Sequence, residues 1–235
     1  MNTDVILIAG PLVRASSWEP TAETLRDLGW RVQVPDVLAH HSSPPAWSTW
    51  SRSLNSQIAP ANRFVLIGHS SASALAADLA TKLPTKAIVI VDGDVPPTEG
   101  AAYPVRPELR AFIQNLAGAD GFLPVWSKWF NGDSNRASLV GIDKLRKDSK
   151  AFAQFESGLP KMHVDWFDEA VDLTRWDHIP AGYVQASKIY DHAAVEARRR
   201  GWPVVNLEGT HLDPTLRPDE TASAIDTITR TLEAT

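Results

Sequence analysis

The chain of 235 residues contains no cysteine, which excludes a thiol nucleophile, a disulfide framework and thiolate metal sites. It also lacks an apolar run long enough to span a bilayer. Its first residues do not form a cationic region followed by a long apolar stretch and a cleavage site, so we expect no signal peptide. These absences predict a cytoplasmic protein, a monomer or homodimer, without a membrane partner.

Basic clusters and glycine-rich phosphate loops are also scarce. The net charge is -5, and the one basic run, at 198–200, lies at the end of an expected helix, so we expect no nucleic-acid partner. Without a glycine-rich loop, nucleotide binding is disfavoured. Four carboxylates between 165 and 172 match no metal-ligand spacing and are typical of a solvated helix face. We therefore expect no metal and no cofactor.

What is present is an alternation of strand and helix patterns. Hydrophobic residues make up 43% of the chain, which suits one globular domain with a large core and an inserted subdomain. The alternation predicts an α/β fold, with a mostly parallel sheet covered by helices on both faces. Strands are expected at 5–9, 30–35, 64–67, 86–91, 181–185 and 203–207, and helices at 18–28, 47–58, 71–83, 193–200 and 218–232.

The alternation stops between residues 94 and 180. This segment is rich in proline, tryptophan and phenylalanine, with short helical patches and no clear strand. We interpret 94–180 as a mostly helical cap over a ligand crevice, and 1–93 with 181–235 as the core. Trp126 and Trp129 are our candidate substrate-binding residues; the alternative is that these aromatic side chains only pack the cap onto the sheet.

The chain is organised around the segment 63–77. An apolar strand pattern at 64–67 is followed by Gly-His-Ser-Ser-Ala at 68–72 and then by an alanine- and leucine-rich helix pattern. A tight strand-to-helix turn of this kind holds a serine hydroxyl out at the edge of a sheet, and it needs small neighbours such as Gly68 and Ala72. Ser70 is therefore the candidate nucleophile; the alternative is a structural serine.

A serine nucleophile needs a general base, and histidine has a pKa near the working pH. Of the seven histidines, His69 adjoins Ser70 but should point away from it. His40 and His41 lie in an early loop, His163 and His178 in the cap, and His192 at the start of a helix. We select His211, which follows the last expected strand and so reaches the same sheet edge as Ser70.

The chain resembles α/β-hydrolase fold proteins over nearly its whole length, and more narrowly a group of small bacterial α/β hydrolases. The resemblance implies a Ser-His-acid triad and hydrolysis of a carbonyl-type substrate, with the histidine late in the chain as it is here. It rests on segments 7–10, 18–20, 68–72, 89–93 with Pro96, 123–130, 200–204 and 209–214.

The resemblance leaves the triad acid open. Most α/β hydrolases carry it a few residues after the penultimate strand, where Lys188 and Ile189 stand here and Asp191 comes slightly late. Some relatives place it after the strand that follows the nucleophile helix, where Asp92 stands. We favour Asp92 over Asp191; Asp94, or no acid at all, is the remaining alternative.

An oxyanion hole needs two N–H donors. The Ser71 N–H, directly after the nucleophile, is one. In the family the other usually belongs to the residue after a His-Gly dipeptide; here Ala9-Gly10 is followed by Pro11, which has no N–H. Leu12 is then the candidate second donor, at the cost of a one-residue shift in the loop.

These residues together predict a serine hydrolase for a small, largely apolar ester, lactone or amide, acting through an acyl-enzyme. One alternative is a lyase or isomerase that uses the same Ser-His pair for proton transfer. The other is a capped-pocket protein that binds or senses a small molecule without turnover.

Overall fold

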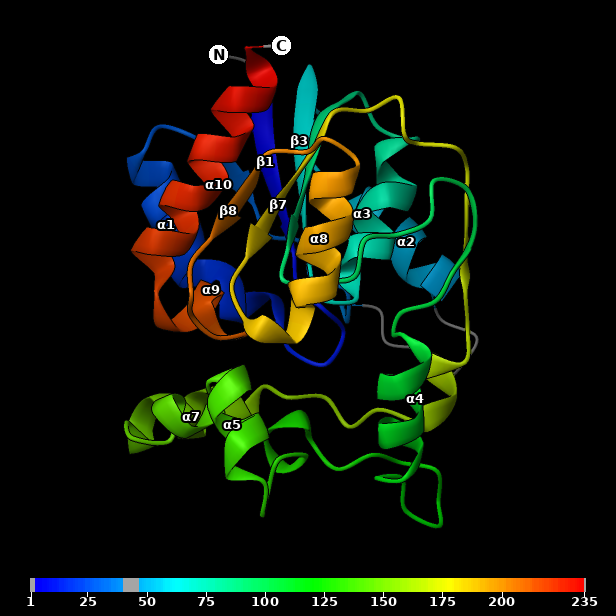
Figure 1. The fold of residues 1–235 in the computed structure, drawn as a ribbon, viewed down its shortest axis with the longest axis vertical. Coiled ribbons are helices and arrows are strands. Elements are labelled where there is room, and N and C mark those ends of the chain that lie inside the picture. The colour runs from blue at the N-terminus through cyan, green and yellow to red at the C-terminus, as the bar shows by residue number, and fades with distance from the viewer. Residues whose placement is uncertain (1–2, 40–46, 235) are drawn as a thin grey trace.

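The computed structural model describes residues 3–39 and 47–234 (Figure 1). Its centre is a six-stranded parallel sheet in the order β2-β1-β3-β4-β7-β8, which confirms the predicted sheet. The strands are β1 (Thr3–Ile8), β2 (Arg31–Gln33), β3 (Arg63–His69), β4 (Thr85–Val91), β7 (Ala181–Gln185) and β8 (Val204–Asn206). His40 and His41 fall outside the described residues.

Helices cover both faces of the sheet, as the alternation predicted. On one face lie α1 (Glu19–Asp27) and α10 (Pro218–Glu233), which contact each other; on the other lie α2 (Trp47–Gln57), α3 (Ala72–Ala80) and α8 (Asp191–Arg199) (Figure 1). Because both faces are covered, the central strands are apolar along their length and buried. Helix α3 is also buried at every position, which its small alanine side chains permit. Among the helices that the structure describes, none has both the length and the apolar character that crossing a membrane requires.

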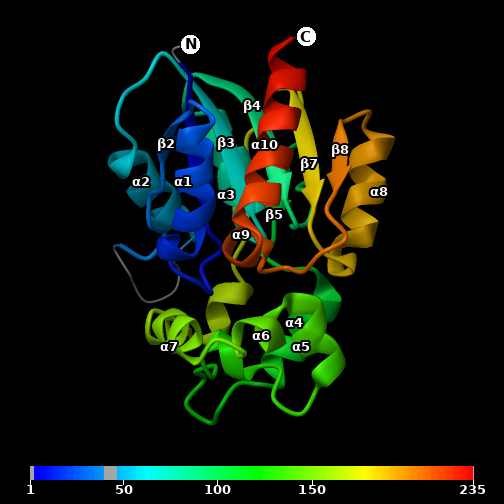
Figure 2. The ribbon, with the colours of Figure 1, turned by 90° about the vertical axis from the view of Figure 1, so that its left-hand side faces the viewer.

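Most of the chain between β4 and β7 lies across the carboxyl ends of the parallel strands (Figures 1 and 2). It forms short helices connected by irregular segments. They are α4 (Pro107–Gln114), α5 (Ser134–Val140), α6 (Ile142–Leu145) and α7 (Ser149–Ser157). We call residues 107–157 the cap helices.

Two short strands, β5 (Gly100–Ala102) and β6 (Val171–Leu173), pair antiparallel within the same insertion. Strand β6 packs against α3, so the two ends of the insertion lie beside the core rather than over it. The expectation of no strand between 94 and 180 is wrong here. Three-residue strands are too short for an alternating pattern to mark them.

Backbone hydrogen bonds join the cap helices to the last core loop. The N–H of His211 donates to the Leu139 carbonyl at 3.3 Å, and the N–H of Leu212 donates to the Val140 carbonyl at 3.1 Å. Both carbonyls belong to α5. The end of this cap helix is thereby fixed against the loop that carries the candidate base.

Candidate active site

Ser70 occupies the turn between β3 and α3 in a strained backbone conformation. Its φ is 56°, a left-handed value that costs a residue with a Cβ about 1–3 kcal/mol. Two hydrogen bonds hold the turn: Ser70 N–H donates to the Val91 carbonyl at 3.1 Å, and Ser73 N–H donates to the Ser70 carbonyl at 3.1 Å. The strand-to-helix turn predicted from the sequence is therefore present, with Ser70 at its tip.

Two glycines make room for this turn. A Cβ on Gly68 would lie 2.8 Å from the Ala72 carbonyl oxygen, because strand and helix backbones approach closely there. A Cβ on Gly93 would lie 2.3 Å from the Ser70 carbonyl oxygen. The Tyr183 hydroxyl also donates to the Gly93 carbonyl at 2.9 Å. Close packing on both sides keeps Ser70 in its strained position.

Asp92 and His211 meet at the same edge of the sheet. The distance from His211 Nδ1 to Asp92 Oδ2 is 2.7 Å, and the Asp92 side chain is fully buried. Asp92 follows β4 with a φ of 43°, so it too is held in a left-handed conformation. Strained residues that their surroundings keep in place are typical of functional sites.

Three further donors hold the Asp92 carboxylate. Its Oδ1 accepts the N–H groups of Ala186 at 3.0 Å and Ser187 at 2.7 Å, and its Oδ2 accepts the Ser187 hydroxyl at 2.7 Å. These donors lie in the loop after β7, where most relatives carry the acid. Here that loop binds the carboxylate instead of supplying it, a role for Ser187 that sequence reasoning missed.

The two alternative acids lie elsewhere. Asp191 accepts from Gln185 Nε2 at 2.5 Å, and Asp94 Oδ1 lies 2.6 Å from His192 Nε2. Neither carboxylate makes a hydrogen bond or ion pair with His211. Of the aspartates that the sequence left open, Asp92 is the one that the structure brings to the candidate base.

The two candidate oxyanion donors border a small cavity. Leu12 and Ser71 line it together with Ser70 and His211, and its volume of about 20 Å³ is close to that of one water molecule. Gly10 and Val13 close a turn around Pro11 and Leu12 through a 3.2 Å backbone hydrogen bond. Within residues 3–39 and 47–234, the N–H groups of Leu12 and Ser71 donate to no backbone carbonyl.

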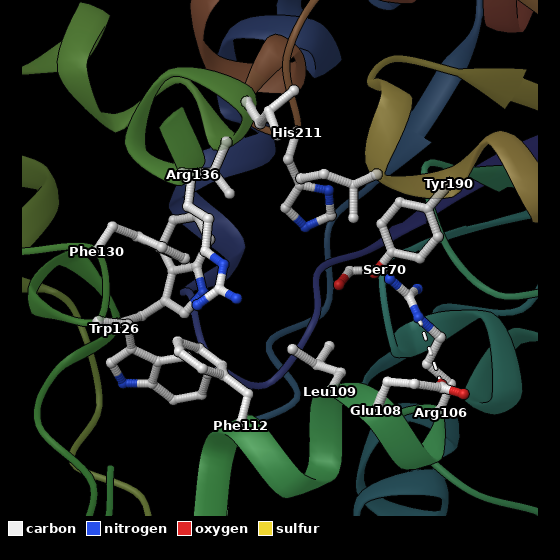
Figure 3. A pocket seen from close by; sticks show the side chains of 14 residues that line it. Ser70, Arg106, Glu108, Leu109, Phe112, Trp126, Phe130, Arg136, Tyr190 and His211 are labelled. Atoms are coloured by element: carbon white, nitrogen blue, oxygen red, sulfur yellow. Dashed lines mark ion pairs between the residues drawn. The ribbon is translucent and has the colours of Figure 1, made fainter. Parts of the chain in front are cut away.

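A larger cavity of about 370 Å³ opens from Ser70 beneath the cap helices (Figure 3). Figure 3 shows Ser70 near both the His211 ring and Tyr190, with the aromatic residues of the cap on the opposite side. Trp126 and Trp129, the candidate substrate-binding residues, both line this cavity. Its size and its mostly apolar wall suit a small organic molecule.

A family model and several solved structures match this chain. The model of a family described as the alpha/beta hydrolase family matches residues 5–224. The chain belongs to the alpha/beta hydrolase family. It is therefore a hydrolase enzyme by family, as its sequence resemblance implied. None of the curated proteins matches the chain in sequence.

Solved structures of low sequence identity share the fold. An extracellular alpha/beta-hydrolase from a Paenibacillus species is 19% identical, with a TM-score of 0.74 over 97% of this chain and 99% of its own. Tomato methylketone synthase I is 16% identical, with a TM-score of 0.75 over 99% of both chains. Polyneuridine aldehyde esterase is 14% identical, with a TM-score of 0.69 over 97% of this chain and all of its own.

Within this family fold, three rings surround the His211 imidazole. The centroid of the His69 ring lies 4.5 Å away at an interplanar angle of 31°, and the Tyr190 ring stacks at 5.5 Å and 26°. Trp126 approaches at 6.2 Å from the cap. The expectation that His69 simply points away from the site is incomplete, because this side chain packs directly on the candidate base.

His69 also makes a hydrogen bond that orients the base. Its Nε2 lies 3.1 Å from the His211 carbonyl oxygen, which can only accept, so Nε2 carries the proton. Its Nδ1 is buried, with no hydrogen-bond partner among the described residues. Burial, with a further contribution from the charge of His211, holds the pKa of His69 well below its ordinary value of 6.5. His69 is thus a neutral residue that positions His211.

We expect the pKa of His69 to make the protein sensitive to acid. Below pH 6.5 the unfolded chain protonates this histidine while the folded chain does not, so the stabilisation is full above pH 6.5 and is lost as the pH falls. One such group contributes a slope of up to about 1.4 kcal/mol per pH unit to the free energy of unfolding. In His69→Gln an amide N–H replaces the Nε2–H, and the amide does not titrate. The free energy of unfolding, measured in urea between pH 5 and 7, should therefore change less steeply with pH in this variant. His178→Gln, at an exposed histidine, is the control; equal slopes in all three proteins would contradict the assignment.

The loop that carries His211 depends on a second buried aspartate. Asp213 Oδ1 accepts the Thr210 N–H at 3.0 Å and the Thr210 hydroxyl at 2.8 Å, and Asp213 Oδ2 accepts from Arg217 at 3.2 Å. A Cβ on Gly209 would lie 1.8 Å from Asp213 Oδ2, so only glycine fits there. Segment 209–214 carries part of the family resemblance, but no role was predicted for Asp213 from the sequence. The signal that could have found it is its position two residues after His211.

Proposed function

We propose that the protein is a serine hydrolase that cleaves small, largely apolar esters, lactones or amides, with Ser70, His211 and Asp92 as its triad. The observation that carries the proposal is the 2.7 Å contact between the buried Asp92 and His211, which lines the same cavity as the strained Ser70. Such a carboxylate fixes the imidazole tautomer and stabilises the imidazolium that forms when the serine loses its proton.

In the proposed reaction the Ser70 hydroxyl oxygen attacks the substrate carbonyl carbon, and His211 Nε2 takes the hydroxyl proton. The N–H groups of Ser71 and Leu12 hold the oxyanion of the tetrahedral intermediate. Collapse breaks the bond to the leaving group, which takes the proton from His211 and leaves an acyl ester on Ser70. A water molecule, deprotonated by His211, then attacks this ester, and the acid and free serine are released.

The cavity supports a small substrate with an apolar body. Its wall is mostly apolar and aromatic, including Trp126, Trp129 and Phe130. Among structures of similar fold, two are named as a pyrethroid hydrolase and as polyneuridine aldehyde esterase, which agrees with hydrolysis of carbonyl compounds. The serine nucleophile argues against haloalkane or epoxide opening, reactions that this fold carries out with an aspartate.

A fluorophosphonate probe tests the nucleophile directly. We expect intact-mass spectrometry to show one covalent adduct on the wild-type protein, mapped to Ser70, and none on Ser70→Ala. Ser138→Ala, at an exposed serine in the cap, should label as the wild type does. A panel of p-nitrophenyl esters of increasing acyl length then reports turnover.

The opposite result would favour a different function. Absence of an adduct, together with tight binding of an apolar ligand and no ester turnover, would point to a binding or sensing protein. Labelling at another serine would overturn the assignment of Ser70.

A further inference from the structure

We propose that Arg106 is a substrate-binding residue that recognises a carboxylate close to the reactive carbonyl, so that the substrates are anionic molecules with an apolar body. The inference deepens the proposed function and rests on it for turnover, but the recognition of a carboxylate can be measured without turnover.

Arg106 reaches into the cavity from the cap. It directly precedes α4, and its side chain lines the cavity together with Ser70 and Tyr190. Figure 3 shows the guanidinium pointing toward Ser70, beneath the Tyr190 ring. Its Cζ lies 5.7 Å from the centroid of that ring, within the range of a cation–π contact. A group bound by this guanidinium would therefore lie beside the nucleophile.

The guanidinium has donors that the protein does not use. Nη1 is buried and makes no hydrogen bond with any described residue. Its nearest carboxylate oxygen, Asp94 Oδ1, is 3.7 Å away, and Nε lies 4.0 Å from Glu108 Oε2. Both distances are too long for a hydrogen bond. A buried donor without an acceptor is costly, and a small movement of the side chain that brings Nη1 to a ligand acceptor would remove that cost.

Asp94 cannot easily move closer to satisfy this donor. Its Oδ1 is already 2.6 Å from His192 Nε2, which lies on α8 of the core. Glu108 is mostly exposed, with 80% of its side chain accessible, so solvent screens its charge. The ion pairs of Arg106 thus keep the guanidinium in place without occupying its donors.

The charges of the wall favour an anion over a neutral acceptor. The side chains that line the cavity include two arginines, Arg106 and Arg136, and one acidic residue, Glu108. A carboxylate matches the planar fork of a guanidinium and forms charge-assisted hydrogen bonds, about twice as strong as neutral ones. The aromatic side chains on the other wall then accommodate the apolar body.

Arg136 provides a matched control. It lines the same cavity, but its Cζ lies 4.5 Å over the Phe112 ring, its Nε lies 3.5 Å from Asp133, and 55% of its side chain is exposed. A cation that is stacked and open to solvent gains less from a ligand carboxylate than a buried donor does. Loss of Arg136 should therefore affect binding of an anion much less.

Ligand binding tests the inference without chemistry. In a Ser70→Ala background, quenching of tryptophan fluorescence is titrated with 3-phenylpropionate and with its neutral isostere 3-phenylpropionamide. We expect the acid to bind about tenfold more tightly than the amide, the ratio that one charge-assisted hydrogen bond provides. Arg106→Met should abolish this ratio, and Arg106→Lys should keep part of it. Arg136→Met should lower the ratio much less than Arg106→Met does. Thermal melting by circular dichroism identifies any variant that has not folded.

A turnover measurement separates this inference from the proposed function. The kcat/KM of the Ser70-containing enzyme is measured for monoethyl succinate and ethyl pentanoate. If the enzyme hydrolyses both esters and its preference for monoethyl succinate over ethyl pentanoate is absent or does not change in Arg106→Met, the role of Arg106 is overturned and the proposed hydrolase function is retained. Carboxylate-selective binding lost in Arg106→Met, without turnover of any ester, would support Arg106 and overturn the hydrolase. The inference is overturned if the acid and the amide bind Ser70→Ala with nearly equal affinity. It is also overturned if the ratio of the two affinities is unchanged when Arg106→Met is added and the protein is folded.

Discussion

We expect kcat to fall by the same factor, about a millionfold, in Ser70→Ala, in His211→Ala and in the double variant, because nucleophile and base act as a unit. Without the serine no acyl-enzyme forms, and without the imidazole nothing takes the hydroxyl proton. Removing the second group from a protein that already lacks the first therefore costs little more. Steady-state hydrolysis of the best p-nitrophenyl ester by all three variants measures the effect.

Residual catalysis should remain in all three variants. The oxyanion donors at Ser71 and Leu12 and the cavity wall are left unchanged, and such groups alone still accelerate the reaction above the rate in water. His178→Ala, at an exposed histidine in the insertion, should retain full activity. If the losses of the two single variants multiply in the double variant, Ser70 and His211 do not act as one unit.

Asp92→Asn is expected to lower kcat by about ten thousandfold with little change in fold, because it forces the wrong tautomer on His211. The hydrogen bonds of Asp92 decide how the new amide is oriented. Oδ1 accepts two backbone N–H groups, from Ala186 and Ser187, so the amide oxygen must take its place. The amide nitrogen then faces His211 Nδ1 and donates to it, and the ring proton moves to Nε2, the atom that must accept from Ser70.

Asp191→Asn is the matched control for this prediction. Asp191 accepts a hydrogen bond from Gln185, and in Asp191→Asn an amide oxygen can accept the same bond. We expect its kcat to stay near that of the wild type. Loss of activity in Asp191→Asn but not in Asp92→Asn would assign the acid to the loop after β7 and contradict the triad proposed here.

The sequence by itself determined the layout of the core. Apolar strand patterns alternating with helix patterns are local signals, and each spans enough residues to be read from the chain alone. Ser70 was found in the same way, because the Gly68-to-Ala72 turn combines a local motif with its flanking strand and helix. His211 followed from chain order and from the common edge at which parallel strands end. The short strands β5 and β6 were not predicted, because three residues are too few to show an alternating pattern of apolar and polar side chains.

Only the tertiary structure decided how side chains from separate loops converge. Asp92 and Asp191 were both plausible acids in the sequence, and the choice depended on the Ser187 loop that binds the carboxylate of Asp92. The contact of His69 with His211 and the unused donors of Arg106 also depend on segments far apart in the chain. Periodicity fixes which face of an element is buried, but hydrogen bonds between loops depend on distances of a few tenths of an ångström, which the packing of the whole fold sets.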